Sequence, residues 1–179
     1  MAVQDGLPEE RKMKKGLLVL VLSAIITTGA AFADHPGGFG IGVQFGGGGY
    51  WGASGFHPHA ALSLKLPKFP IFWAIRMDIT NDHFGLGLSG DYYLIDDKLA
   101  PEIGLNWYLG VGGSFGLSFG NDWMGLGVAA RLPIGLSWQP LPLLEIFLQV
   151  VPSLGLDILP GIHFPSGGFG GDFGIRLWF

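Results

Sequence analysis

The chain has 179 residues, enough for one domain, and only 13% of them are charged while 32 are glycine. These few charges cannot cover the surface of a soluble protein of this size. A large part of the surface is therefore expected to face something other than water. The small net charge of -4 without a basic stripe argues against a nucleic-acid partner, and the absence of cysteine excludes a disulfide framework, thiolate zinc sites and thiol catalysis.

The first 33 residues are typical of a secretory signal peptide. Basic residues at positions 11 to 15 precede an apolar run over 16–26, and Ala31-Phe32-Ala33 places small residues where signal peptidase acts. The apolar run is shorter than the ~20 residues of a spanning helix. We expect cleavage after Ala33, which leaves residues 34–179 as the mature domain. Residues 1–12 contain acidic residues that a basic leader lacks, so Met13 is the expected start and 1–12 an upstream extension.

Beyond residue 34, apolar residues alternate with small or polar ones almost without interruption, a period of two that is typical of strands with two different faces. The pattern predicts eight strands: Gly37–Phe45, Phe56–Leu66, Ile71–Thr80, His83–Ile95, Glu102–Phe119, Trp123–Trp138, Leu143–Asp157 and Phe169–Phe179. Gly110–Gly113 could form a turn and give nine segments. The alternation passes through it unchanged, which favours one strand.

Residues that favour turns separate these segments, as in Asn81-Asp82 and Asn121-Asp122, and two longer loops cover 46–55 and 158–168. An even number of strands joined in order by turns allows the sheet to close with both termini at one end. The predicted fold class is therefore all-β, an eight-stranded antiparallel up-and-down transmembrane β-barrel.

Charges and glycines indicate which strand face is inside. Charged residues within strands occupy the phase opposite to Leu, Ile and Val, and many glycines share that phase, where a soluble barrel would need a solubilising surface. A narrow barrel interior has room for small residues and paired charges. The apolar face is thus expected to face lipid, and the arginines to pair with carboxylates in a lumen charge network. Its expected members are Lys65, Arg76, Asp78, Asp91, Glu102, Arg131, Glu145, Asp172 and Arg176. Bulky inward residues, among them Phe72, Tyr93 and Tyr108, would either line an apolar pocket or plug the lumen.

Aromatic residues of the outward phase cluster near the turns on the side of the termini. Trp73, Tyr92 and Trp138, together with the final Phe179, fit an interfacial girdle, although aromatics are common in any sheet.

The last strand ends with Phe173, Ile175, Leu177 and Phe179 in one phase and resembles the C-terminal assembly signal of bacterial outer-membrane proteins. With the signal peptide and eight strands, the chain resembles the small barrels typified by OmpW, OmpX and the OmpA membrane domain. Its glycine and aromatic content is most similar to OmpW-like or spirochaetal small barrels. The resemblance implies the outer membrane of a diderm bacterium, insertion by the barrel-assembly machinery and passage of small apolar solutes.

Other motifs do not change this interpretation. Residues 85–90 spell a dinucleotide fingerprint, but no helix follows it. His57 and His59, like His35, His83 and His163, lack an acidic third ligand at a readable spacing and are expected to be solvated loop histidines. The serines have no evident histidine and acid partner, so we expect no enzyme and no cofactor.

Two functions remain open for such a barrel. One is an OmpW-like narrow channel for small or apolar solutes, which the modest, apolar loops favour. The other is a non-transporting surface barrel that acts as an adhesin or structural component. Pro133 and Pro152 interrupt neighbouring strands and predict either bulges or a lateral opening. The expected partners are outer-membrane lipid and the assembly machinery, with the barrel as a monomer.

Overall fold

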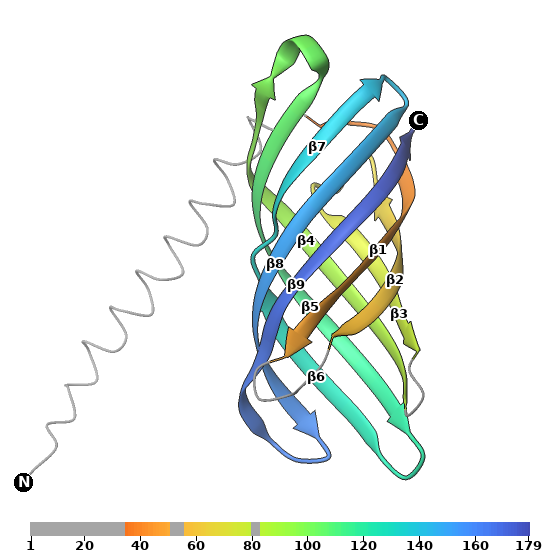
Figure 1. Ribbon diagram of the computed structural model, residues 1–179, viewed down its shortest axis with the longest axis vertical. Coiled ribbons are helices and arrows are strands. Elements are labelled where there is room, and N and C mark those ends of the chain that lie inside the picture. Colours follow the sequence, from red (N-terminus) through yellow and green to blue (C-terminus); the bar gives the residue numbers. More distant parts are fainter. Residues whose placement is uncertain (1–34, 51–55, 80–82) are drawn as a thin grey trace, which may run out of the picture.

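The computed structural model describes residues 35–50, 56–79 and 83–179, which form one antiparallel sheet closed into a tall barrel (Figure 1). The predicted signal peptide and the Met13 start lie outside these residues. No helix in the described segments is long and apolar enough to cross a membrane. The elements are β1 (Gly40–Tyr50), β2 (His57–Lys65), β3 (Phe72–Ile79), β4 (His83–Ala100), the 3-10 helix η2 (Pro101–Ile103), β5 (Leu105–Gly120), β6 (Met124–Arg131), β7 (Ile134–Leu141), β8 (Leu144–Leu159) and β9 (His163–Trp178).

Hydrogen bonds close a ring of eight strand positions. Strands β1 to β5 pair in sequence, as do β8 and β9, and β1 pairs with β9 to close the sheet. The two short strands β6 and β7 both pair with β5 on one side and β8 on the other, so they share one position. The eight-stranded antiparallel barrel is confirmed, and its predicted sixth strand consists of two pieces.

The break between β6 and β7 lies at Leu132 and Pro133, because proline has no N–H to donate to the sheet. The wall is nevertheless hydrogen-bonded around it. Gly110 N–H donates to the Pro133 carbonyl (2.8 Å), and Leu132 N–H donates to the Pro152 carbonyl (3.0 Å). Leu132 and Ile134 both remain exposed on the outer wall, and Pro133 is fully buried. The break therefore keeps the alternation of faces.

Two boundaries differ from the sequence prediction around the β4–β5 connection. The fifth strand starts at Leu105 and not at Glu102, because Pro101 opens η2 and Gly104 ends it in the left-handed region at φ 70°. β4 continues to Ala100, past the predicted end at Ile95. The register shifts between Tyr93 and Ile95, and this bulge turns Asp96 into the lumen. Gly110–Gly113 lies inside β5, as the unbroken alternation predicted.

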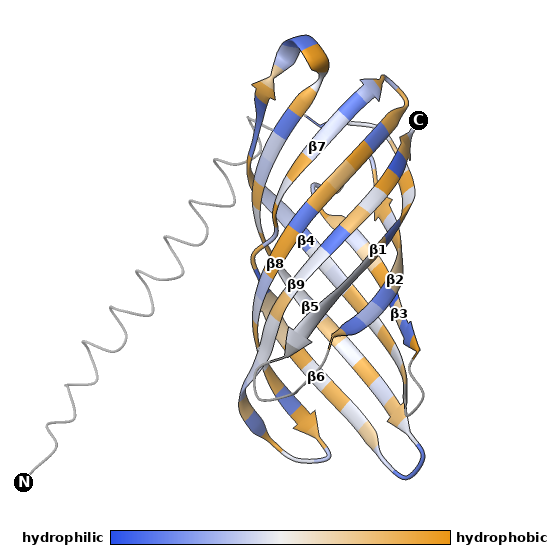
Figure 2. Cartoon of the chain, viewed as in Figure 1, coloured by the Kyte–Doolittle hydropathy of each residue, from blue (hydrophilic) through white to orange (hydrophobic). Residues whose placement is uncertain are grey.

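Apolar side chains cover the outer wall, whereas polar or small side chains line the inner wall together with a group of aromatic ones. Figure 2 shows the corresponding alternation of hydropathy along the strands. This is the inverse of a soluble barrel and is the pattern of strands that face lipid. Exposed outer residues include Val43, Ile75, Leu88, Phe115, Leu136, Leu148 and Phe173, and buried inner ones include Ser63, Ser89, Asp91, Gln149 and Arg176.

The chain closes its own ring at one end. Phe39 N–H donates to the Phe179 carbonyl (2.9 Å), and Phe179 N–H donates to the Phe39 carbonyl (2.8 Å). We call this end, with the C-terminus and the β2–β3, β4–β5 and β7–β8 connections, the proximal end; it is uppermost in Figure 1. The opposite end, with the β5–β6 and β8–β9 connections, is the distal end.

Candidate functional site

The proximal part of the lumen is filled by aromatic side chains. Phe72 stacks on Tyr93 with ring centroids 4.1 Å apart, and Tyr93 stacks on Tyr108 at 4.3 Å. His35 meets all three rings edge-on at 5.2 to 5.9 Å. Trp178 is also buried in this cluster. We call these five residues, with Glu145 and Arg176 described below, the proximal plug.

A buried carboxylate forms the polar centre of the plug. Glu145 is completely buried and accepts hydrogen bonds from Arg176 Nη1 (2.6 Å), Trp178 Nε1 (2.8 Å) and Ser137 Oγ (2.9 Å). Its Oε1 also lies 2.9 Å from His35 Nε2. The Arg176 guanidinium lies over the rings of Phe72 and Phe147, at 4.8 and 4.7 Å from their centroids. The ion pair, the hydrogen bonds and the ring contacts therefore hold the Glu145 and Arg176 side chains in one arrangement.

His35 connects two distant parts of the wall. Its Nδ1 lies 2.6 Å from Asp96 Oδ2 on β4, while its Nε2 faces Glu145 on β8. Burial alone would lower the pKa of His35, but Glu145 and Asp96 outweigh it and raise this pKa to about 9. The ring is then an imidazolium that donates to both carboxylates at neutral pH. The prediction of a solvated loop histidine is wrong for His35, because two carboxylates inside the barrel bind its ring.

The distal part of the lumen is open because its wall carries little side-chain volume. In one row across the sheet, each residue pairs with the next on the neighbouring strand, in the order Arg76, Gly87, Gly116, Gly127 and Asp157. The next row holds Ala74, Ser89, Ser114, Ala129 and Gly155. Such small residues leave the interior unfilled. We call the resulting hollow the distal cup.

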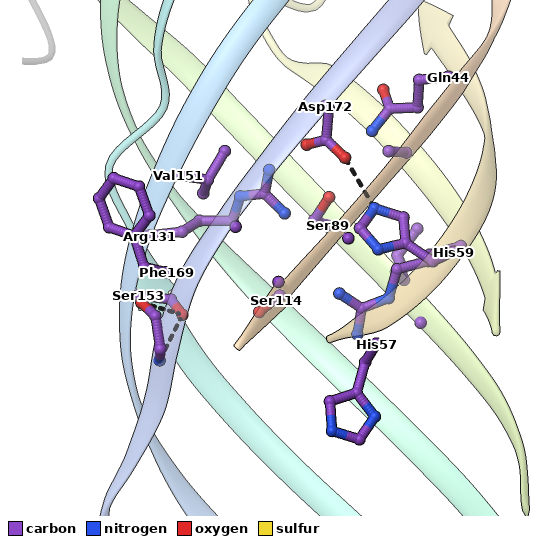
Figure 3. A pocket seen from close by; sticks show the side chains of 18 of the residues that line it. Gln44, His57, His59, Ser89, Ser114, Arg131, Val151, Ser153, Phe169 and Asp172 are labelled. Carbon is purple, nitrogen blue, oxygen red and sulfur yellow. Dashed lines mark hydrogen bonds and ion pairs between the residues drawn. The ribbon is translucent and has the colours of Figure 1, made fainter. Parts of the chain in front are cut away.

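The distal cup has two adjoining parts, which share Arg76, Ser114 and Ser153 in their lining. A vestibule of about 640 Å³ reaches the distal connections, where Trp123 and Pro160 line it. An inner cavity of about 80 Å³ lies nearer the plug, and Figure 3 shows Arg131, Ser89, Ser114 and His59 around it. The cup therefore ends blindly at the plug.

Ion pairs surround the inner cavity. Arg131 Nε lies 2.9 Å from Asp91 Oδ1, and Arg76 Nε lies 3.5 Å from Asp78 Oδ1. On β9, Asp172 Oδ1 lies 2.7 Å from His59 Nε2 (Figure 3). Asp172 Oδ2 accepts a hydrogen bond from Gln149 Nε2 (2.9 Å). Asp96 and Gln149 are polar lumen residues that the sequence reasoning missed. The β4 bulge hides the inward phase of Asp96, whereas alternation alone could have found Gln149.

The structure divides the predicted lumen charge network. Arg176 pairs with Glu145 in the plug, whereas Arg76 and Arg131 pair with their own aspartates beside the cup. Lys65 is buried and donates to the carbonyls of Leu66 (3.1 Å) and Phe69 (2.8 Å), not to a carboxylate. Glu102 lies exposed on η2, outside the lumen, because the turn before β5 begins earlier than the alternation suggests.

The proposed girdle and assembly residues lie on the outer wall near the proximal end. Trp73 and Tyr92 lie on β3 and β4, and exposed Trp138 on β7 donates its Nε1 hydrogen to the Ile103 carbonyl (2.9 Å). The four alternate residues of the terminal segment are also exposed on the outer face: Phe173, Ile175, Leu177 and Phe179.

The other candidates from the sequence are the glycine motif, the histidines and the serines, and none of them forms a separate site among the described residues. The glycines of residues 85–90 lie inside β4, which continues as a strand to Ala100, so no helix N-terminus follows them. Among the described residues no group of three metal-ligating side chains comes together, and the side chain of His83 lies outside them. Ser137 donates to Glu145, and Ser63 accepts from Arg176, so both serines support charged residues of the plug.

Comparison with known structures identifies the architecture. The fold is similar to the crystal structure of Neisserial surface protein A (NspA), with a TM-score of 0.54 and 15% identity over 80% of this chain and 98% of that one. The N-terminal β-barrel domain of Pseudomonas aeruginosa OprF gives a TM-score of 0.49 at 14% identity, over 78% and 97% of the two chains. No protein-family model and no curated protein matches the sequence. The chain thus has the fold of the small eight-stranded outer-membrane barrels.

Proposed function

We propose that this protein is an integral outer-membrane barrel that does not conduct along its axis and displays the distal cup at the cell surface. The apolar outer wall matches lipid, and a closed barrel satisfies its backbone there without an edge. Outer-membrane barrels of even strand number have periplasmic termini, so the plug would face the periplasm and the cup the exterior.

The single observation that carries this proposal is the proximal plug. Tyr108 and Glu145 are fully buried, and Trp178 and Arg176 are only 2% exposed. Opening the plug would separate the buried ion pair of Arg176 and Glu145, and an unpaired charge is unfavourable in a closed interior. A closed lumen favours the surface-barrel alternative, as an adhesin or structural component, over the narrow channel.

The narrow, OmpW-like channel for apolar solutes would need a different route. The inner cavity is lined by Arg76, Arg131 and Asp172, which suit polar groups. A lateral opening at Pro133 and Pro152 would have to separate a wall in which both proline carbonyls accept hydrogen bonds. We therefore infer that the two prolines only change the local curvature of the barrel wall. The similarity to a protein named as a surface protein supports the surface role.

The remaining assignments complete the proposal. The protein would reach the outer membrane of a diderm bacterium after cleavage near Ala33. The barrel-assembly machinery would recognise the terminal segment that ends at Phe179, whose backbone pairs with Phe39 to close the ring. Lipid then covers the outer wall of the barrel, which we expect to be a monomer.

Planar-bilayer recording of the purified barrel tests the proposal. Wild type should show no unitary conductance steps. The triple variant His35→Ala/Tyr93→Ala/Tyr108→Ala removes three plug side chains and should produce them, and Trp138→Ala is the matched control because its ring lies outside. Steps of similar size in wild type and the triple variant would contradict a closed lumen.

A further inference from the structure

Arg76 presents its guanidinium to the distal cup. Arg76 packs closely over Gly87, where a Cβ would lie only 3.2 Å from its Nε and Nη2. Beside Gly116 there is more room, because a Cβ there would lie 3.9 Å from Nη2. The side chain is 31% exposed, and its ion pair with Asp78 is long at 3.5 Å. Within the described part of the chain, Arg76 Nε makes no hydrogen bond. The side chain thus has an unused donor, and its exposed fraction leaves part of the guanidinium open to a ligand in the cup.

Arg131 is a second incompletely used guanidinium in the same lining. Its side chain is only 10% exposed. Arg131 Nε lies 2.9 Å from Asp91 Oδ1, but among the described residues neither atom has a hydrogen-bond partner, so the pair lacks the alignment of a hydrogen bond. A buried guanidinium donor without an acceptor is energetically unfavourable unless a further acceptor is supplied.

The side chains that line the inner cavity include more guanidinium groups than carboxylates. Two arginines line it against one carboxylate, Asp172, and that carboxylate is already engaged by His59 and Gln149. The hydroxyls of Ser89 and Ser114, which face each other across β4 and β5, add two further donors. The complementary ligand therefore carries negative charge on several acceptor oxygens.

We propose that the inner cavity of the distal cup binds a small oxyanion, a phosphate, sulfate or carboxylate group, between Arg76 and Arg131. Guanidinium groups match the geometry of such oxyanions and bind them through paired hydrogen bonds. The cavity of about 80 Å³ is several times the ~10–15 Å³ that one water needs. A larger molecule that carries the group could extend into the vestibule. The site goes beyond the proposed surface role and does not depend on whether the plug opens.

Nuclear magnetic resonance of the full barrel in a non-ionic detergent tests the site. Inorganic phosphate, sulfate or acetate is titrated while the Nε–Hε signals of the arginines are followed, and the signals of Arg76 and Arg131 should shift with saturation. Arg76→Gln and Arg131→Gln should each weaken phosphate binding at least about tenfold, the effect of losing one charge-assisted contact. Lys68→Gln is the matched control, because it removes one exposed charge at the proximal end and should leave binding unchanged.

A second variant blocks the site without removing charge. Gly116→Leu should abolish binding, because its first side-chain atom fits at 3.9 Å from Arg76 and the rest fills the cup. All variants should keep wild-type circular dichroism. The source of the anion is distinguished by adding phosphatidic acid to the detergent: displacement of inorganic phosphate would indicate a lipid phosphate, and no displacement a soluble anion. Absence of shifts at millimolar phosphate, or equal weakening by Lys68→Gln, would overturn the proposal.

Discussion

Replacing Glu145 by alanine should strongly destabilise the barrel. The substitution removes the acceptor for Arg176, Trp178 and Ser137 and one of the two carboxylates that face His35. Two cationic groups would then remain in a site where Arg176 is only 2% exposed. Removing one partner of such a buried pair costs about 3–5 kcal/mol. We expect the free energy of unfolding to fall by this amount.

The assay is urea unfolding of the refolded barrel in lipid vesicles, followed by tryptophan fluorescence and by the mobility of unheated samples on gels. Glu145→Gln keeps the volume and part of the hydrogen bonding, so its loss should be smaller than that of Glu145→Ala. Glu102→Gln is the control, because Glu102 is exposed on η2 and should leave the unfolding curve unchanged. A loss below about 1 kcal/mol for Glu145→Ala would refute the view that the plug rests on this carboxylate.

Three further predictions concern other parts of the barrel. Folding raises the pKa of His35 from 6.5 to about 9, which corresponds to a contribution of about 3 kcal/mol to stability. This contribution is fully present below pH 6.5 and is lost as pH rises through about 9. The urea midpoint of wild type should therefore fall over this pH range, and that of His35→Gln should not. Gly135→Ala should lower stability by about 1–3 kcal/mol, because its Cβ would clash with the ring of Tyr108 and lie 2.7 Å from the Leu148 carbonyl oxygen. The added Cβ of Gly170→Ala meets nothing nearer than 3.6 Å, so this control should be neutral. Equal unfolding midpoints for the two variants would contradict this packing. Deleting Phe179 should reduce the amount of barrel in the outer membrane more than it slows refolding in vitro, because this exposed residue lies at the end of the closing strand; equal surface yield on immunoblots would remove the case for a terminal assembly signal.

The alternation of residues along the chain was sufficient to predict the order of the strands and their faces, although β1, β8 and β9 extend into the predicted loops 46–55 and 158–168. Exposed Ile75 and buried Phe72 lie on the faces that the period of two assigns, because each position in a strand points opposite to the next. The phase even survives the break at Pro133. Local turn chemistry is less regular, so the beginning of β5 was misplaced and Glu102 was assigned to the lumen.

The tertiary structure alone decided that the lumen is closed at one end and hollow at the other. His35 lies 61 positions from Asp96 and 110 from Glu145, and no local pattern indicates that these three side chains meet. The bulge after Tyr93 that turns Asp96 inward is visible only in the pairing of β4 with β5. The cup likewise arises where the register sets Gly87, Gly116 and Gly127 side by side. The period of a strand depends on its own residues, but the row in which two inward residues meet depends on register and ring closure, which the folded sheet fixes.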